Sequence, residues 1–234
     1  MARTGSRYAL LLAARPFVKS SSHKGKLIPL NARNKPRQQR SIQRSREILE
    51  ITASLLEKVG FDDLTTILIA KELGISVGTL YHYFPNKYAI MYAIAEQWLA
   101  EYSSALETMK DWDIEGRSLN WFCESSVELL SSVYESQRGI MPLISAITAV
   151  PELRALDESH DELVIKQLSI ILKRLGIKRT AIERARVSFI MLEMTHALLV
   201  VSLEQSGKQK QGTLADIARM LTVLIDNSTT AAHR

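Results

Sequence analysis

The segment GISVGTLYHYFPNK, residues 74–87, gathers groups that could bind a polar partner on one short helix. At about 100° per residue, Leu80 and Phe84 point to one side, which predicts that they enter the core. Three residues point to the opposite side: Gly78, Tyr81 and His82. Aromatic side chains beside a glycine are a poor choice for a solvated surface. We therefore expect this side to press against a flat, polar partner.

These residue types suit the major groove of a DNA duplex. Gly78 has no side chain, so the helix backbone could come close to the duplex. Tyr81 offers a ring for a thymine methyl group and a hydroxyl for a base edge or a phosphate. Donors beside it would contact phosphates: Thr79, Tyr83 and Lys87. Lys87 also lies in the first turn of the next expected helix, whose free N–H groups favour an anion.

A helix-turn-helix is expected to position this segment. An apolar stripe predicts a first helix that ends at Gly60: Ile48, Ile51, Leu55 and Val59. Thr65 can cap a second helix that runs to about Leu73, Ser76 can cap a third, and Asn86 a fourth to about Lys110. The second and third helices, joined by LGIS, form the motif whose second helix enters a major groove. The same geometry also occurs in proteins that never contact DNA.

The rest of the chain predicts an all-α protein. Apolar residues recur at spacings of three and four almost everywhere after residue 41, and alternating runs are scarce. Further helices are expected near residues 118–136, 138–149, 151–175, 179–205 and 213–228. The clearest breaks are Gly176 and the segment QSGKQKQG, and we find no internal repeat.

The net charge of +5 hides an asymmetry between the two ends of the chain. Residues 1–40 hold ten Lys/Arg and no Asp/Glu, whereas the remaining residues hold 20 Lys/Arg and 25 Asp/Glu. A basic arm before a mildly acidic body suggests a polyanionic partner. The arm lacks helical periodicity, so we expect it to be disordered. A targeting segment and a mis-set start of translation are alternative interpretations.

Several classes of protein are disfavoured. Cys123 is the single cysteine, which excludes an intrachain disulfide and a cysteine-based zinc site. It lies in an ordinary amphipathic turn, NWFCESS, without a glycine elbow, and no phosphate or dinucleotide motif is present. We therefore expect no enzyme, no cofactor and no metal site. No apolar run reaches the roughly 18 residues of a membrane span.

Residues 65–90, TTILIAKELGISVGTLYHYFPNKYAI, closely resemble the DNA-binding domain of tetracycline-repressor-like (TetR-family) regulators. The match covers about 50 residues, from Ser45 to Ile94. The resemblance implies phosphate contacts from one set of residues: Thr65, Thr66, Thr79, Tyr83 and Lys87. It implies base or near-base contacts from a second set: Ser76, Val77, Gly78, Tyr81 and His82.

One departure from the family pattern concerns the second helix. Positions 67 and 68 are usually polar or charged in the family, but here they are Ile67 and Leu68. A phosphate contact from this helix is therefore expected to be missing. Residues 41–97 carry five Lys/Arg against seven Asp/Glu, so the basic arm is expected to supply the missing attraction.

The resemblance also implies a domain plan. Residues 1–40 would be the arm, residues 41–97 the three-helix DNA-binding domain, and residues 98–234 a larger helical domain for ligand binding and dimerisation. Members bind palindromic sites as homodimers, with recognition helices about 34 Å apart. Two strongly apolar segments are the expected dimer helices: residues 188–203 and 214–225. Burial in the chain's own core is the alternative for both.

An effector pocket is expected among the middle helices. Glu193 and His196 lie three residues apart in an apolar stretch, with Arg186 near the same face, so these groups either pair with one another or meet a ligand. Seven residues are the candidate ligand contacts: Trp98, Trp121, Tyr134, Met141, Phe189, Glu193 and His196. Tyr102, Phe122 and Met194 are further candidates, although such residues often form plain core.

The function implied by the resemblance is a cytoplasmic, sequence-specific transcriptional regulator. We expect a repressor that a small-molecule effector releases from its operator by shifting a conformational equilibrium. The alternative is a protein of the same fold that binds a ligand or a membrane surface and has no specific operator.

Overall fold

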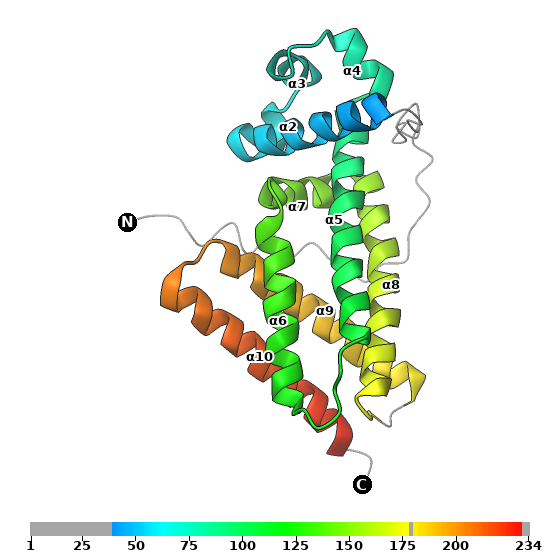
Figure 1. The fold of residues 1–234 in the computed structure, drawn as a ribbon, viewed down its shortest axis with the longest axis vertical. Helices are drawn as coiled ribbons and strands as arrows, with labels where there is room; N and C mark the ends of the chain where they lie inside the picture. The colour runs from blue at the N-terminus through cyan, green and yellow to red at the C-terminus, as the bar shows by residue number, and fades with distance from the viewer. Residues whose placement is uncertain (1–38, 178–179, 231–234) are drawn as a thin grey trace. The chain divides into compact units, whose positions relative to one another are not determined.

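The computed structural model describes residues 39–177 and 180–230, and these residues form nine α-helices and no strand. In chain order (Figure 1) the helices are α2 (Gln39–Asp63), α3 (Thr66–Glu72), α4 (Val77–Tyr83), α5 (Lys87–Lys110), α6 (Leu119–Ser136), α7 (Ile140–Ala149), α8 (Pro151–Arg174), α9 (Ala181–Leu203) and α10 (Gly207–Thr230). The predicted all-α fold is confirmed. The predicted basic arm falls almost entirely in residues 1–38, outside the described residues.

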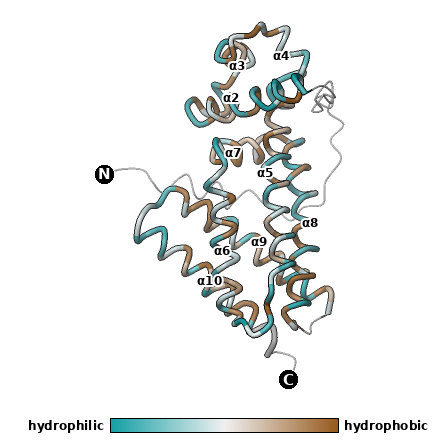
Figure 2. The backbone as a smooth tube through the Cα atoms, in the orientation of Figure 1, coloured by the Kyte–Doolittle hydropathy of each residue, from teal (hydrophilic) through white to brown (hydrophobic). Residues whose placement is uncertain are grey.

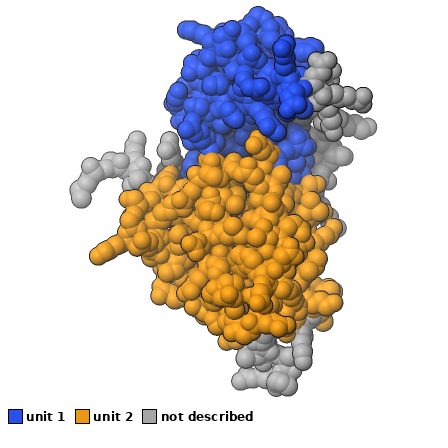
Figure 3. All heavy atoms as spheres, viewed as in Figure 1, with its two compact units in different colours: residues 1–96, 138–156 blue, residues 97–137, 157–234 orange. Residues whose placement is uncertain are grey.

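The chain folds as two compact units (Figure 3). Within the described residues, unit 1 comprises residues 39–96 and 138–156, and unit 2 comprises the remainder, beginning at Gln97. The sequence predicted that the larger domain begins at residue 98. However, α7 and the start of α8 belong to unit 1, whereas the sequence placed them in the C-terminal domain.

A close contact between α2 and the start of α7 explains this difference. The backbone N–H of Gly139 donates to Glu57 Oε1 at 2.9 Å. Gly139 has a φ of 70°, and a Cβ at this position would lie 2.8 Å from the carbonyl oxygen of Ala53. Only glycine allows the two backbones to come this close. The packing of α7 on α2 thus depends on a contact between segments far apart in the sequence.

The helix-turn-helix forms as the sequence predicts. Three predicted caps are present, each a side-chain oxygen that accepts a backbone N–H: Thr65, Ser76 and Asn86. Gly60, with a φ of 77°, interrupts α2 where the first helix was expected to end. Gly74, with a φ of 64°, lies in the turn between α3 and α4. These local signals are sufficient to set the boundaries of α3 and α4.

The last helix begins earlier than predicted. The sequence placed its start near residue 213, but α10 begins at Gly207 and continues through Gly212. Lys210 Nζ lies 3.0 Å from Glu135 Oε1 on α6, and Thr213 Oγ1 donates to Gln205 Oε1 at 2.7 Å. These contacts stabilise the additional residues at the start of the helix despite the low helix propensity of glycine.

Unit 2 packs α9 against α6 and α10. Hydrophobic and hydrophilic residues alternate in short runs along α10 (Figure 2), which gives it one buried and one exposed face. Among the described helices, α9 alone is long and apolar enough to cross a membrane by length and composition, which the sequence did not predict. Of its apolar window 44% is buried inside the protein.

Candidate nucleic-acid interface and apolar cavity

α4 presents one side to the core of unit 1 and the other to the surface. Leu80 is 0% exposed and Phe84, the C-cap residue, is 1% exposed. On the opposite side Tyr81 is 38% exposed, and Gly78 and His82 are also exposed. The predicted division of this helix is therefore confirmed, while its contact with DNA stays a prediction.

Hydrogen bonds hold several of the predicted DNA-contacting side chains in the free protein. The hydroxyl of Tyr81 lies 3.1 Å from Thr66 Oγ1, which joins α4 to α3. Ser76 Oγ lies 2.8 Å from Thr79 Oγ1 and also caps α4. Because these bonds already restrict the side chains, an interface formed here would lose less conformational entropy.

The flanks of α4 carry partly covered groups. Val77 and Tyr83 are half-buried. The rings of His82 and Tyr83 are perpendicular, with centroids 5.5 Å apart. Thr65 Oγ1 accepts the backbone N–H of Leu68, so its predicted phosphate contact would have to share this oxygen. All ten predicted DNA-contacting residues lie in unit 1 between positions 65 and 87.

Lys87 has a structural role that the sequence did not predict. Its Nζ donates to the carbonyl oxygens of Phe61 and Leu64, each at 3.1 Å, and lies 4.5 Å from the centroid of the Phe61 ring. The ammonium group thereby closes the turn between α2 and α3. Its third N–H remains for the predicted phosphate contact, since an ammonium group has three donors.

The surface of α3 is unusually apolar for a nucleic-acid interface. Ile67 is 69% exposed, which agrees with the expectation that this helix lacks one phosphate contact. Within residues 41–97 acidic side chains outnumber basic ones. The described helix-turn-helix therefore offers shape and hydrogen-bonding groups, but little positive charge of its own.

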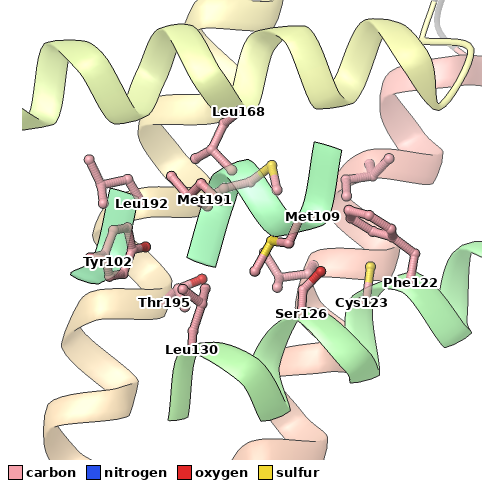
Figure 4. A pocket seen from close by; sticks show the side chains of 13 residues that line it. Tyr102, Met109, Phe122, Cys123, Ser126, Leu130, Leu168, Met191, Leu192 and Thr195 are labelled. Carbon is pink, nitrogen blue, oxygen red and sulfur yellow. The ribbon is translucent and has the colours of Figure 1, made fainter. Parts of the chain in front are cut away.

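Unit 2 encloses a small apolar cavity (Figure 4). Thirteen residues from α5, α6, α8, α9 and α10 line it, and its volume is about 20 Å³. Four of the lining residues carry a hydroxyl or a thiol: Tyr102, Cys123, Ser126 and Thr195. The other nine are Leu, Ile, Met or Phe, so none of these thirteen described residues is charged. A cavity of this volume has room for about one water molecule.

Burial keeps the titratable groups of this cavity neutral. It raises the pKa of the Tyr102 hydroxyl, with a further contribution from Asp161. It also raises the pKa of the Cys123 thiol, against the opposing effect of a hydrogen bond with Thr222. A neutral thiol is a poor nucleophile. The cavity is therefore suited to binding rather than to covalent chemistry.

The seven candidate ligand contacts lie outside the described lining of this cavity: Trp98, Trp121, Tyr134, Met141, Phe189, Glu193 and His196. Met141 belongs to unit 1, and Phe189 is 37% exposed on α9. Two of the further candidates, Tyr102 and Phe122, do line the cavity. Ligand contact by the original seven stays a prediction.

Three of the seven form an aromatic cluster in unit 2. The Tyr134 hydroxyl lies 2.6 Å from His196 Nδ1, and the Trp98 ring is perpendicular to Tyr134 at a centroid distance of 5.7 Å. The sequence suggested Glu193, Arg186 or a ligand as the partner of His196. The structure shows a hydrogen bond between His196 and Tyr134 on α6, which joins α6 to α9.

Sequence reasoning missed most of the polar residues of the cavity. Ser126 lies four residues after Phe122 and four before Leu130, and all three line the cavity from α6. A serine within the apolar stripe of an amphipathic helix was the available signal. Cys123 and Thr195 gave weaker signals, since small polar residues are common in buried helices.

Two family models match the chain. The model described as "Bacterial regulatory proteins, tetR family" covers residues 48–94. The model described as "Tetracyclin repressor-like, C-terminal domain" covers residues 118–223. Together they include the helix-turn-helix, the cavity-lining part of α6, and most of α9 and α10.

Curated relatives match this chain over short stretches. The tetracycline repressor protein class A from transposon 1721 of Escherichia coli is 43% identical over 54 residues, which are 23% of this chain and 25% of that repressor. An HTH-type transcriptional regulator of Staphylococcus aureus is 31% identical over 71 residues, which are 30% of this chain and 38% of the regulator. The chain thus spans about a quarter of the length of the E. coli repressor and about two fifths of the length of the S. aureus regulator.

Solved structures share the fold over most of the chain. Salmonella enterica GusR has a TM-score of 0.62 at 17% identity, covering 80% of this chain and 96% of its own. The TetR family regulator PfmR from Thermus thermophilus has a TM-score of 0.54 at 26% identity, covering 76% of this chain and 96% of its own. With the two family models and the helix-turn-helix geometry, these matches show that the chain belongs to the TetR family of transcriptional regulators, which are non-enzymatic DNA-binding proteins.

Proposed function

We propose that this protein is a cytoplasmic repressor that binds a palindromic operator as a homodimer and leaves it when a small-molecule effector occupies unit 2. The observation that carries this proposal is the surface side of α4. Gly78, Tyr81 and His82 are exposed there, while Leu80 and Phe84 fix the helix in the core. The match of the tetR-family model to residues 48–94 supports this use of the helix-turn-helix.

The contacts divide by chemistry. Base or near-base contacts are assigned to the residues at the start and on the surface side of α4: Ser76, Val77, Gly78, Tyr81 and His82. Phosphate contacts are assigned to the flanking donors: Thr65, Thr66, Thr79, Tyr83 and Lys87. Phosphate contacts fix the register of the helix on the duplex, and groove-facing side chains select the sequence.

A second copy of the chain is the proposed occupant of the exposed side of α9 and α10. Four large apolar residues are exposed on these two packed helices: Ile182, Phe189, Met220 and Val223. An isologous dimer would cover the same patch on both copies, and a palindrome presents the same half-site twice. Light scattering on the purified protein should therefore give the mass of a dimer.

The proposed release mechanism depends on α5. This helix begins at Lys87, directly after the helix-turn-helix, and continues into unit 2, where Tyr102, Leu106 and Met109 line the cavity. An effector that moves α5 would change the spacing of the two α4 helices in the dimer. The effector needs to favour the non-binding state by only about 1–3 kcal/mol to weaken operator binding 5- to 150-fold.

The test uses Gly78→Ala. A Cβ at this position would meet Ser76 Oγ at an ordinary 3.7 Å, so the fold tolerates it. Alanine should stabilise the protein by up to about 1 kcal/mol through helix propensity. The new methyl group would nevertheless keep the helix backbone away from the groove. We expect affinity for a palindromic duplex to fall at least about tenfold, which corresponds to about 1.4 kcal/mol.

Ser159→Ala is the matched control, because Ser159 is an exposed position on α8 that also gains helix propensity. It should leave operator affinity unchanged. Fluorescence anisotropy with a palindromic and a scrambled duplex gives the affinities, and thermal melts at one protomer concentration give the stabilities. Equal binding of both duplexes by the parent protein would refute specific recognition. Binding to anionic vesicles alone would favour a membrane-surface role instead.

A further inference from the structure

We propose that the cavity in unit 2 binds a neutral, largely apolar molecule with one hydroxyl or carbonyl oxygen, and that Ser126 binds this oxygen. The proposal deepens the effector role given above and rests on it. It names the chemical class of the ligand and the residue that distinguishes this class from others.

Ser126 is the first observation that points to a ligand. Its side chain is 6% exposed, and its Oγ has no hydrogen-bond partner among residues 39–177 and 180–230. Figure 4 shows this oxygen turned into the cavity, on the side of Met109. Ser131, five residues later on the same helix, is 3% exposed but donates to Glu135 Oε1 at 2.7 Å. The two buried serines of α6 therefore differ in whether the hydroxyl is available to bind a ligand: that of Ser126 is, and that of Ser131 is not.

A buried hydroxyl without a partner in the protein is unfavourable unless a bound molecule supplies the hydrogen bond. A ligand oxygen placed against Ser126 would restore that bond. The serine hydroxyl can donate to a carbonyl or an ether oxygen, and it can also accept from a hydroxyl. Thr195 on α9 and Tyr102 on α5 bring two further hydroxyls to the same lining.

The remaining lining decides the charge of the ligand. Among the thirteen described lining residues there is no Asp, Glu, Lys, Arg or His. A carboxylate, phosphate or ammonium group would leave water without meeting an opposite charge, which is strongly unfavourable. The cavity thus selects a neutral molecule, and its nine apolar residues favour one that is mostly hydrocarbon.

The size of the cavity explains how such a ligand could act. At about 20 Å³ the cavity is too small for any molecule larger than water in the ligand-free form. Met109 on α5 and Met191 on α9 lie in the lining, and their unbranched side chains can change rotamer to open space. Occupation therefore requires side chains of these helices to move, which links ligand binding to the position of α5.

The experiment compares three probes with the same eight-carbon chain: 1-octanol, octanoate and octylamine. Calorimetry and tryptophan fluorescence at pH 7.5, without DNA, measure their binding to the full-length protein. The centroids of the Trp112 and Phe122 rings are 5.6 Å apart, so tryptophan emission should respond to an occupied cavity. We expect 1-octanol to bind at least about tenfold more tightly than either charged probe. Equal or tighter binding of octanoate or octylamine, or no binding of 1-octanol up to its solubility, would overturn the proposal.

Two serine variants locate the contact. Ser126→Ala should weaken 1-octanol binding about 3- to 10-fold, the effect of one neutral hydrogen bond, while the melting temperature of the free protein stays the same or rises. Ser131→Ala, the matched control, should lower the melting temperature and leave 1-octanol binding unchanged. A Ser126→Ala protein that binds 1-octanol as tightly as the parent would remove Ser126 from the site.

Operator binding is measured on the same preparations. Loss of probe selectivity with intact operator binding would overturn the ligand class alone. Failure of the parent protein to prefer a palindromic duplex would overturn the proposed function, whatever the probes do.

Discussion

The helix-turn-helix surface and the cavity of unit 2 differ in how their polar groups are satisfied. At the surface of α3 and α4, the hydroxyls of Thr65, Ser76 and Tyr81 already have partners in the free protein. In the cavity, Ser126 Oγ has no partner among the described residues. The hydroxyls of the surface are therefore already held by hydrogen bonds in the free protein, whereas the hydroxyl of Ser126 in the cavity has no partner among the described residues.

This difference fits two kinds of binding. A surface that matches a rigid duplex gains affinity when its side chains are fixed beforehand. A cavity that responds to a ligand benefits from being small and from having a hydroxyl without a protein partner. Ligand binding then changes both the packing of the helices and the hydrogen bonding of that hydroxyl. The rigid part would select the DNA sequence, and the adaptable part would respond to a small molecule.

The largest expected effect tests the rigidity of unit 1. Gly139→Ala introduces a Cβ 2.8 Å from the Ala53 carbonyl oxygen at a residue with a φ of 70°. The left-handed conformation alone costs a non-glycine residue about 1–2 kcal/mol. With the added overlap we expect a loss of about 3 kcal/mol in the free energy of unfolding, measured in urea.

Gly116→Ala is the control for Gly139→Ala. Gly116 has a φ of 72°, but a Cβ there would meet nothing within 4 Å. Its substitution should cost only the conformational strain, about 1–2 kcal/mol. Equal losses of unfolding free energy for the two variants would mean that α2 and α7 can move apart at little cost. Unit 1 would then not be rigid at this contact.

The next prediction concerns Lys87, which serves the fold and is proposed to serve DNA binding as well. Lys87→Met keeps the apolar stem but removes two charged hydrogen bonds to the carbonyls of Phe61 and Leu64. We expect a loss of about 2 kcal/mol in stability. The slope of log affinity against log salt should fall by about 1 if the third N–H contacts a phosphate.

Lys71→Met, at an exposed position on α3, is the comparison for stability and should change it by less than about 0.5 kcal/mol. A Lys87→Met protein as stable as Lys71→Met would contradict the structural role. A normal stability loss with an unchanged salt slope would restrict Lys87 to the fold.

The next prediction, with a smaller expected effect, concerns the low positive charge of the helix-turn-helix surface. Residues 1–36 hold eight Lys/Arg, whereas residues 41–97 carry a small net negative charge. Removing residues 1–36 should weaken operator binding about tenfold at moderate salt and flatten its salt dependence, because fewer counterions are released. A full-length variant with Gln at these eight positions should behave like the deletion. An unchanged salt slope would show that the arm does not contact the duplex.

The sequence predicted the helix-turn-helix better than the rest of the fold, and the reason is the range of the signals. The caps at Thr65, Ser76 and Asn86 depend on residues three positions away, so the pattern of the chain contains them. The hydrogen bond between Gly139 and Glu57 joins residues 82 positions apart, and no local sequence pattern predicts it. For that reason the sequence did not predict that α7 belongs to unit 1.

The cavity was harder still, because five helices contribute to it. Trp98 and Tyr134 were expected as ligand contacts. In the structure they pack with His196, and the Tyr134 ring also packs on Tyr102, which lines the cavity. Ser126 carried the useful signal, a polar residue on an apolar stripe, and it was not recognised. Periodicity predicts which residues are buried, but which buried residues border an empty space depends on the packing of all five helices.

The smallest expected effect asks whether the interior of unit 2 also responds to pH. His160 Nε2 on α8 lies 2.9 Å from Ser103 Oγ on α5, and burial lowers the pKa of His160 against the opposing effect of a hydrogen bond with the backbone of Leu99. The folded protein therefore binds this proton less readily than the unfolded chain. The resulting stability is complete above the unfolded value of about 6.5 and declines as the pH falls below it toward the folded-state pKa. Thermal melts of the parent protein should show a small loss between pH 7.5 and 5.5, and His160→Gln should reduce that loss. The same decline in both proteins would assign it to other titratable groups and would remove His160 as the cause.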